Sequence, residues 1–254
     1  MSDIKNILTQ IKSLAGTVDV FIPSLNQTVK VQQLSVKQCK DLINMPQNIL
    51  HAQYAFFRKF YNILKENASE YADQFNIVDR VPLCITLRSK SLDKYQDIKL
   101  SSDIIPLIPT VKYDLVAPTV TTENYIFETK IPTLKSEDIF NKFVMTNYKL
   151  STDVSVEEMQ QLSQEVFGEL AVIEICKYIS RITIRKEDID IDMESLSPMQ
   201  RKEIVENIQL DELRDVIDFN NKVHTVEAMY TNYTIDGKEQ PVQLEIGPDF
   251  FIFI

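Results

Sequence analysis

The chain has few of the residues from which catalytic and cofactor sites are usually built. Its 254 residues include two histidines, His51 and His224, and neither has a cysteine or second histidine at ligand spacing, which argues against a zinc site. No serine lies in a G-x-S-x-G context. The four glycines are too far apart to form a loop that cradles phosphate, so P-loop and Rossmann nucleotide binding are not expected. They are Gly16, Gly168, Gly237 and Gly247.

Cysteine and long apolar runs are also scarce. Cys39, Cys84 and Cys176 stand far apart and are odd in number, which argues against a disulfide framework and favours a reducing cytoplasm. Each lies in a helical apolar pattern and is expected to be a small core side chain. Residues 1–5 lack the basic start and apolar stretch of a signal peptide, and no window reaches the ~18–20 apolar residues of a membrane span. We therefore expect a soluble protein.

Basic residues are fewer than acidic residues. The chain carries 37 acidic and 27 basic residues, a net charge of −10, with no long Lys/Arg cluster. Because phosphate neutralisation supplies most non-specific affinity for nucleic acids, DNA and RNA are not expected partners. Other proteins remain as the expected partners.

What the chain does have is a strongly apolar end. Residues 250–254 are five consecutive large apolar side chains, and burying each is worth roughly 1.5–3 kcal/mol. They must pack on the protein's own core or on a second chain, a homo-oligomer included. Because an expected hairpin precedes them, we assign Phe250 and Phe251 to the core, and Ile252, Phe253 and Ile254 to a partner contact.

The first hundred residues predict helices and one hairpin. Apolar residues at three- and four-residue spacing from Ile4 to Leu14 predict a short helix that Gly16 ends. Alternation predicts strands at 18–22 and 29–31 around a turn at 23–27. Ser35 and Gln38 form a capping box for the next helix. Helices are then expected over 47–67 and 77–89, with Pro82 in the first turn of the second.

The remainder predicts a mixed α+β fold that is rich in helix. Prolines and β-branched residues over 96–134 indicate strands and extended loop. Helical signals follow at 136–138, 155–179, 198–206 and 209–228, and a hairpin closes the chain. The second half of the 155–179 helix is apolar nearly all round, which predicts the central helix of the core. We expect one domain over 1–254, with hairpins near both termini and a weak boundary near 100–134.

The acidic segment 187–194 is the sharpest chemical candidate. Asp188, Asp190 and Asp192 alternate along a strand and could hold a hard cation, which would suit a metal-dependent enzyme. The pattern fails as a calcium loop because Met193 and Met199 occupy the required glycine and glutamate positions. The competing interpretation, a solvated strand face with Ile189 and Ile191 turned inward, is favoured. No metal or other cofactor is expected.

Aromatic residues in the 47–67 helix are candidates for partner contact. They could stack bases, but the acidic chain favours core packing or a protein interface. With the N-terminal hairpin, they give the partner-binding candidates Phe21, Tyr54, Phe57 and Tyr61.

Several segments, read in order, resemble the baseplate hub proteins of T4-like (T-even-type) tailed phages. Residues 18–31, followed by Leu34-Ser35-Val36-Lys37-Gln38, are similar to the family's opening strand, P-S turn, K-V strand and L-x-V-K-E/Q helix. Residues 82–91 are similar to its L-x-x-L-R-S/A-K-S helix end. Residues 98–104 and the closing hairpin with 249–251 also fit, so the resemblance covers most of the chain. The turn at 24–26 lacks the glycine that is commoner in relatives.

The resemblance implies a non-enzymatic role in tail morphogenesis, and it brings no catalytic residues. Chains of this length with a leading helix look most like the hub assembly protein, which would bind hub or tape-measure proteins in the host cell cytoplasm. The alternative is a permanent structural subunit of the virion baseplate. The metal-dependent enzyme remains the distant third hypothesis.

Overall fold

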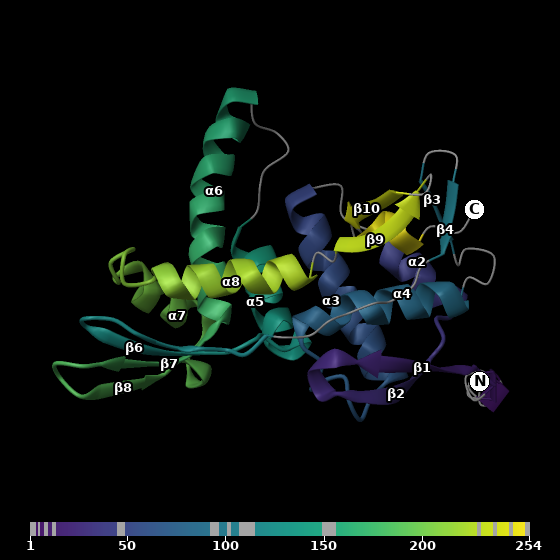
Figure 1. Cartoon of the computed structure of the whole chain (residues 1–254), viewed down its shortest axis with the longest axis horizontal. Helices are drawn as coiled ribbons and strands as arrows, with labels where there is room; N and C mark the ends of the chain where they lie inside the picture. Colours follow the sequence, from purple (N-terminus) through teal and green to yellow (C-terminus); the bar gives the residue numbers. More distant parts are fainter. Residues whose placement is uncertain are drawn as a thin grey trace.

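The computed structural model describes residues 4, 6–7, 10–11, 14–44, 49–91, 97–100, 103–106, 115–148, 156–227, 230–235, 238–243 and 246–251. They form an α+β fold of helices and small antiparallel sheets, as the sequence predicts. Buried apolar side chains gather in two clusters. The helices and strands that contribute most to each cluster lie in the two halves of the long axis (Figure 1).

The first cluster begins with the predicted hairpin. Strands β1 (Thr17–Ile22) and β2 (Gln27–Gln32) pair antiparallel, with Val20 opposite Val29, around a 3-10 turn at Pro23–Leu25. Alternate side chains of β1 are buried, because successive residues of a strand point to opposite faces. Val18, Val20 and Ile22 therefore enter the core.

Three helices complete the first cluster. Helix α2 (Val36–Ile43) begins at the predicted capping box of Ser35 and Gln38. Helix α3 (Ile49–Asn67) is followed by the 3-10 helix η2 (Ile77–Asp79) and α4 (Arg80–Ser91). Pro82 lies in the first turn of α4, where its missing N–H costs no helical hydrogen bond.

The second cluster lies between a sheet and four helices. Strands β5 (Thr119–Thr121), β6 (Tyr125–Thr129), β7 (Ile179–Ile184) and β8 (Ile189–Asp192) form an antiparallel sheet in that order. The helices packed with it include α5 (Leu134–Asn147) and α6 (Val156–Lys177). The others are α7 (Pro198–Glu206) and α8 (Arg214–Glu227), which lie above the sheet in Figure 1.

Two further hairpins agree with the expected strand regions. Strands β3 (Asp97–Leu100) and β4 (Asp103–Pro106) pair in the proline-rich region. Strands β9 (Tyr230–Ile235) and β10 (Lys238–Gln243) pair in the closing hairpin, and its predicted turn at 236–237 lies outside the described residues. The leading segment is helical at residues 4, 6, 7, 10 and 11, as predicted.

Several boundaries differ from the expectations. Helix α5 begins at Leu134, because the hydroxyl of Thr133 accepts a hydrogen bond from the Ser136 backbone and caps the helix earlier. Helix α8 begins at Arg214, five residues late, because residues 210–213 form turns. The helix expected to reach 179 ends at Lys177, and the unpredicted strand β7 starts at Ile179.

The two clusters are joined by apolar contact. Tyr178, Phe219 and Val223 come from segments that pack mainly in the second half, yet their side chains belong to the first cluster. Leu115 and Ala117 pack against the first cluster, whereas Val120 is buried in the second. The polypeptide therefore passes from the first cluster to the second within the 100–134 region. All three cysteines are free and buried, as expected.

Candidate partner-contact surfaces

The three aspartates of the acidic segment occupy different local settings. Asp188 has φ 50° in the turn between β7 and β8. Asp190 accepts a hydrogen bond from the Thr183 hydroxyl at 2.5 Å, and the Asp192 carboxylate accepts the backbone N–H of Glu194 at 3.0 Å. Among the described residues there is no group of three or more His, Cys, Asp or Glu side chains placed to hold a metal ion.

The inward placement expected for Ile189 is wrong. Its side chain is 44% exposed, and only Ile191 is partly covered. Strand β8 is the edge strand of its sheet and is only four residues long. The second cluster therefore covers one of the two isoleucines.

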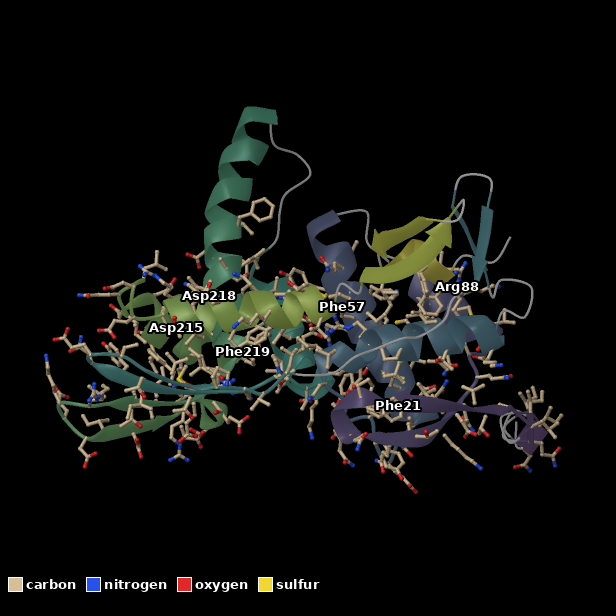
Figure 2. All side chains as sticks on the ribbon, viewed as in Figure 1. Phe21, Phe57, Arg88, Asp215, Asp218 and Phe219 are labelled. Atoms are coloured by element: carbon tan, nitrogen blue, oxygen red, sulfur yellow. The ribbon has the colours of Figure 1, made fainter. Side chains whose placement is uncertain are left out.

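Phe21 lies on the outer face of the N-terminal hairpin, as a contact residue would. It is 50% exposed and pairs with Thr28 across the two strands. Its neighbours in β1, Val20 and Ile22, are both buried. Phe21 is labelled on the hairpin in Figure 2.

The turn of that hairpin is anchored to a distant part of the chain. The backbone N–H of Ser24 donates to Asp79 Oδ1 at 3.0 Å, and its hydroxyl donates to Oδ2 of the same carboxylate. Asp79 Oδ2 also accepts the Asn76 backbone N–H at 2.7 Å. At the other end of α4, the Ser91 hydroxyl accepts the Leu34 N–H at 2.8 Å. The hairpin and α4 thus form one braced unit.

The aromatic residues of α3 are less accessible than a contact helix requires. Tyr54 is half-buried against the second cluster, and burial raises the pKa of its hydroxyl. Phe57 is half-buried, with the Arg80 guanidinium 3.6 Å from its ring centroid. Tyr61 is 5% exposed and donates its hydroxyl to Asp73 at 2.6 Å. Tyr61 is thus a core residue, which corrects its assignment to the surface.

The C-terminal apolar segment divides as expected where it is described. Phe250 is 8% exposed and Phe251 is fully buried. The Phe251 ring centroid lies 6.0 Å from that of Phe56 and 6.3 Å from that of Phe60, in the first cluster. The Arg88 guanidinium lies 4.8 Å from the Phe250 centroid. Ile252, Phe253 and Ile254 lie outside the described residues.

A charged group centred on the buried Lys177 lies where α6 meets α8, with the Glu174 side chain 27% and the His224 side chain 45% exposed, and the sequence did not reveal it. The Lys177 ammonium is 2.5 Å from Glu174 Oε2, and His224 Nε2 is 3.3 Å from the other oxygen of that carboxylate. Burial disfavours the ionised carboxylate, but Lys177 and His224 outweigh it and lower the pKa of Glu174 to about 2. The sequence suggested only Glu227 as a neighbour of His224. The only feature of the sequence that indicates this group is the three-residue spacing of Glu174 and Lys177, which places the two side chains next to each other on a helix.

A second buried ion pair links α4 and α5. Arg80 donates to Glu137 through its terminal nitrogen, and both side chains are almost fully buried. The Arg80 guanidinium also covers the Phe57 ring. Because a buried ion pair pays a large desolvation cost, its geometry restricts how the helices can pack. The Arg80–Glu137 pair thus joins the two halves of the molecule.

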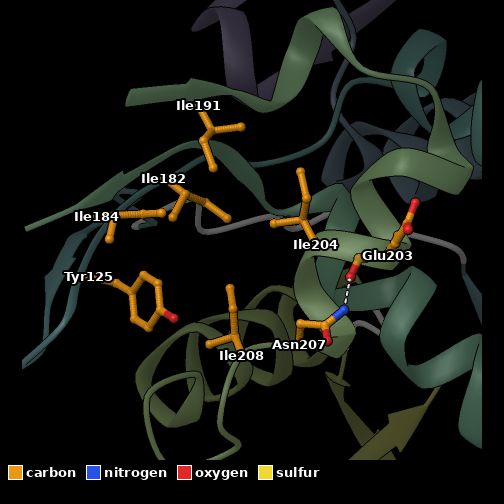
Figure 3. A pocket seen from close by; sticks show the side chains of 8 residues that line it. All are labelled: Tyr125, Ile182, Ile184, Ile191, Glu203, Ile204, Asn207 and Ile208. Carbon is orange, nitrogen blue, oxygen red and sulfur yellow. Dashed lines mark hydrogen bonds between the residues drawn. The ribbon is translucent and has the colours of Figure 1, made fainter. Parts of the chain in front are cut away.

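A shallow apolar pocket of about 380 Å³ lies between the sheet and α7 (Figure 3). Its apolar lining comes from Ile182, Ile184 and Ile191 on the strands and from Ile204 and Ile208 near α7. Its polar lining consists of Tyr125, Glu203 and Asn207, and the Asn207 amide donates to the Glu203 carbonyl at 2.7 Å. The lining suits an apolar side chain and contains no nucleophile paired with a base.

Comparison with known proteins adds no relative to this description. No family model, curated protein or solved structure matches the chain. None of the helices within the described ranges has the length and apolar character needed to cross a membrane.

Proposed function

We propose that this chain is a non-enzymatic phage tail morphogenesis factor that helps to assemble the central hub of a T-even-type baseplate. One observation carries the proposal: three of the separate segments that resemble hub proteins pack together in one cluster. Side chains from 18–38, 82–91 and 249–251 all contribute to the first cluster. Segments far apart in the sequence thus form one physical unit, as expected if the resemblance reflects a shared fold.

The surfaces of that unit suit binding better than chemistry. Phe21 offers an exposed aromatic ring on a hairpin whose turn is hydrogen-bonded to Asp79 and whose following residue Leu34 is hydrogen-bonded to Ser91. A braced surface loses little conformational entropy when it binds. By binding the assembly-competent state of a hub or tape-measure protein more tightly than its alternatives, such a surface shifts that partner's population toward assembly.

The contact is tested by shortening the chain at the point where the core ends. Deletion of residues 252–254 spares Phe251, whereas a longer deletion would remove a fully buried ring from the first cluster. We expect both the shortened protein and Phe21→Ser to be as stable as wild type, with the same denaturant concentration at the midpoint of unfolding. We also expect each to fail to support hub formation in reconstituted tail assembly. Leu210→Ser, at a residue that is 71% exposed in the other half, is the matched control. Normal hub formation by both variants would contradict the proposal.

Retention in the particle separates an assembly factor from a permanent subunit. We expect quantitative mass spectrometry of purified virions to find the chain absent or far below one copy per hub subunit. Stoichiometric presence would instead assign it to the baseplate structure. Co-purification from infected cells then identifies the hub or tape-measure protein that it binds.

A further inference from the structure

The shallow pocket between the sheet and α7 leaves apolar side chains open to solvent. Four of its lining side chains are only partly buried: Ile184, Ile191, Ile204 and Ile208. The lining isoleucines face a common space in Figure 3. Ile189 is 44% exposed and lies directly across from Ile184, so it extends the same apolar face to the edge of the sheet. A side chain that entered the pocket would remove this surface from water.

The part of the pocket rim that α7 contributes is negatively charged and accepts hydrogen bonds. Glu203 is exposed, and its carboxylate forms no ion pair within the part of the chain that the structure describes. The basic side chains of α7 are held elsewhere, because Lys202 pairs with two other carboxylates and Arg201 donates to backbone carbonyls. Asn207 donates its amide N–H to the Glu203 carbonyl, which leaves its side-chain oxygen as an acceptor. This rim favours a ligand with positive charge.

The basic residues that follow β7 are also directed to other groups. Arg185 donates to the backbone carbonyls of Thr122 and Glu123. A hydrogen bond from Thr122 lowers the pKa of the Glu212 carboxyl group, and the charge of Lys186 adds to that effect. The negative charge at the rim is therefore left for a partner to neutralise.

Helix α2, in the other half of the molecule, presents a surface of the complementary kind. Val36 is the first residue of α2 and is 65% exposed although it is apolar. Lys37 follows it, and Lys40 lies about one helical turn further on. Both lysines are exposed, and neither has an ion-pair partner among the described residues. Asp41 is the one acidic residue of α2. We call Val36, Lys37 and Lys40 the α2 patch.

The α2 patch and the pocket rim match in spacing but lie far apart in one chain. Glu203 and Asn207 are four residues apart, and Lys37 and Lys40 are three apart, so each pair of side chains is about 5–6 Å apart on its helix. The capping box fixes the first turn of α2, so the patch loses little conformational entropy on binding. Helices α2 and α7 lie in opposite halves of the molecule (Figure 1). One chain therefore cannot place its α2 patch in its own pocket.

We infer that the occupant of the pocket is the α2 patch of a second copy of this chain. Val36 then enters among the isoleucines, and the two lysines reach the acidic rim. Because the two surfaces differ, each copy offers its α2 to one neighbour and its pocket to another, and copies assemble head to tail in closed rings or filaments. The contact is small, and small contacts are weak and reversible. It uses neither Phe21 nor residues 252–254, so it stands independently of the hub proposal.

Solution mass measured against concentration tests the contact. We expect light scattering of the full-length protein to give a weight-average mass that rises above the 29.4 kDa of one chain as the concentration approaches millimolar. Val36→Glu should lower the association constant roughly tenfold or more, because it brings a negative charge to the acidic rim. Its circular dichroism should match wild type, since Val36 is exposed and an acidic residue is favourable in the first turn of a helix. Ile139→Glu, at an apolar residue of α5 that is 53% exposed, is the matched control and should leave the mass curve unchanged.

A charge exchange between two variants identifies the two surfaces. Glu203→Lys, and separately Lys37→Glu with Lys40→Glu, should each lower the association constant roughly tenfold or more, because like charges then meet across the contact. An equimolar mixture of the two variants should return the association constant to within a few-fold of wild type. In the mixture each α2 can meet a pocket of opposite charge, which neither variant offers by itself.

Three results would overturn the inference. The first is a wild-type mass that stays at 29.4 kDa up to millimolar concentration, which would leave the pocket to a different protein. The second is association that Val36→Glu does not weaken. The third is a mixture of the charge variants that associates no better than its components. Hub formation is not measured in these experiments, so their failure and the failure of the hub proposal are distinguishable.

Discussion

Ser24 and Asp79, 55 residues apart in the chain, are joined by two hydrogen bonds from the serine to a single carboxylate. The serine lies in the turn of the N-terminal hairpin, and the aspartate lies at the end of η2, just before α4. Asp79 has no exposed surface, so its charge depends on these donors and on the Asn76 N–H. This contact fixes the hairpin that presents Phe21.

Ser24→Ala should destabilise the protein by about 1–3 kcal/mol, because it removes a donor to a buried carboxylate. The measurement is the free energy of unfolding in urea at pH 7. Ser69→Ala, at an exposed position, is the matched control and should stay within about 0.5 kcal/mol of wild type. An equally small effect for Ser24→Ala would show that the backbone N–H alone satisfies Asp79.

Asp79→Asn tests whether the Asp79 carboxyl group lowers the free energy of unfolding as the pH rises. Burial raises the pKa of Asp79 above the ordinary 3.8, although the Ser24 and Asn76 donors oppose that effect. The folded state then holds the proton to higher pH than the unfolded state does, so stability from this group falls as the pH rises above 3.8. The wild-type free energy of unfolding minus that of Asp79→Asn should therefore increase as the pH is lowered toward 3.8. A decrease would contradict the assigned direction.

Glu174→Gln should show the opposite pH dependence. The pKa of Glu174 is lowered from 4.5 to about 2, so the folded state favours the ionised form. Its contribution is fully present above pH 4.5 and is lost as the pH falls toward 2. At pH 7 the substitution should cost about 3–5 kcal/mol, because the Lys177 side chain, 5% exposed, keeps a buried charge without its partner.

Urea titrations at several pH values between 2 and 7 measure the Glu174 effect. Glu70→Gln, at an exposed position, is the matched control and should show little change at any pH in that range. If the difference between wild type and Glu174→Gln stayed constant across the range, the ionised carboxylate would not be the source of the stability.

Phe251→Ala should destabilise the first cluster by about 3–5 kcal/mol, because it leaves a cavity beside Phe56 and Phe60. Phe251→Leu retains most of the volume and should cost clearly less. Both are measured by urea denaturation. Equal effects of the two variants would indicate that the ring contributes through its aromatic contacts and not through its volume.

Local pattern predicted much of this fold because the relevant interactions are short in sequence. The alternation in β1 and the Ser35–Gln38 capping box depend on neighbours within a few residues, and both are confirmed. Boundaries were less accurate where tertiary contacts compete. Glu212 accepts the Asn124 amide at 2.5 Å, a contact with the distant β5–β6 turn, and α8 begins only after it.

The candidate contact surface was only partly predictable. Phe21 is exposed and Phe251 is buried, as strand alternation and the preceding hairpin suggested. Tyr61 was misassigned, because an aromatic residue on a helix apolar around most of its circumference has no sequence signal for which face the core covers. Asp73 decides its orientation by accepting the phenol hydrogen bond.

By itself the sequence determined the fold class, most of the secondary-structure elements and the burial of Phe250 and Phe251. These follow from apolar periodicity, caps and turn residues, which act locally. Only the tertiary structure decided which charges are buried and which apolar stripes stay exposed. Glu174, Lys177 and His224 acquire their roles from the crossing of α6 and α8, while Ile4, Ile7, Ile11 and Leu14 stay exposed, because local pattern does not specify which surfaces the fold brings together.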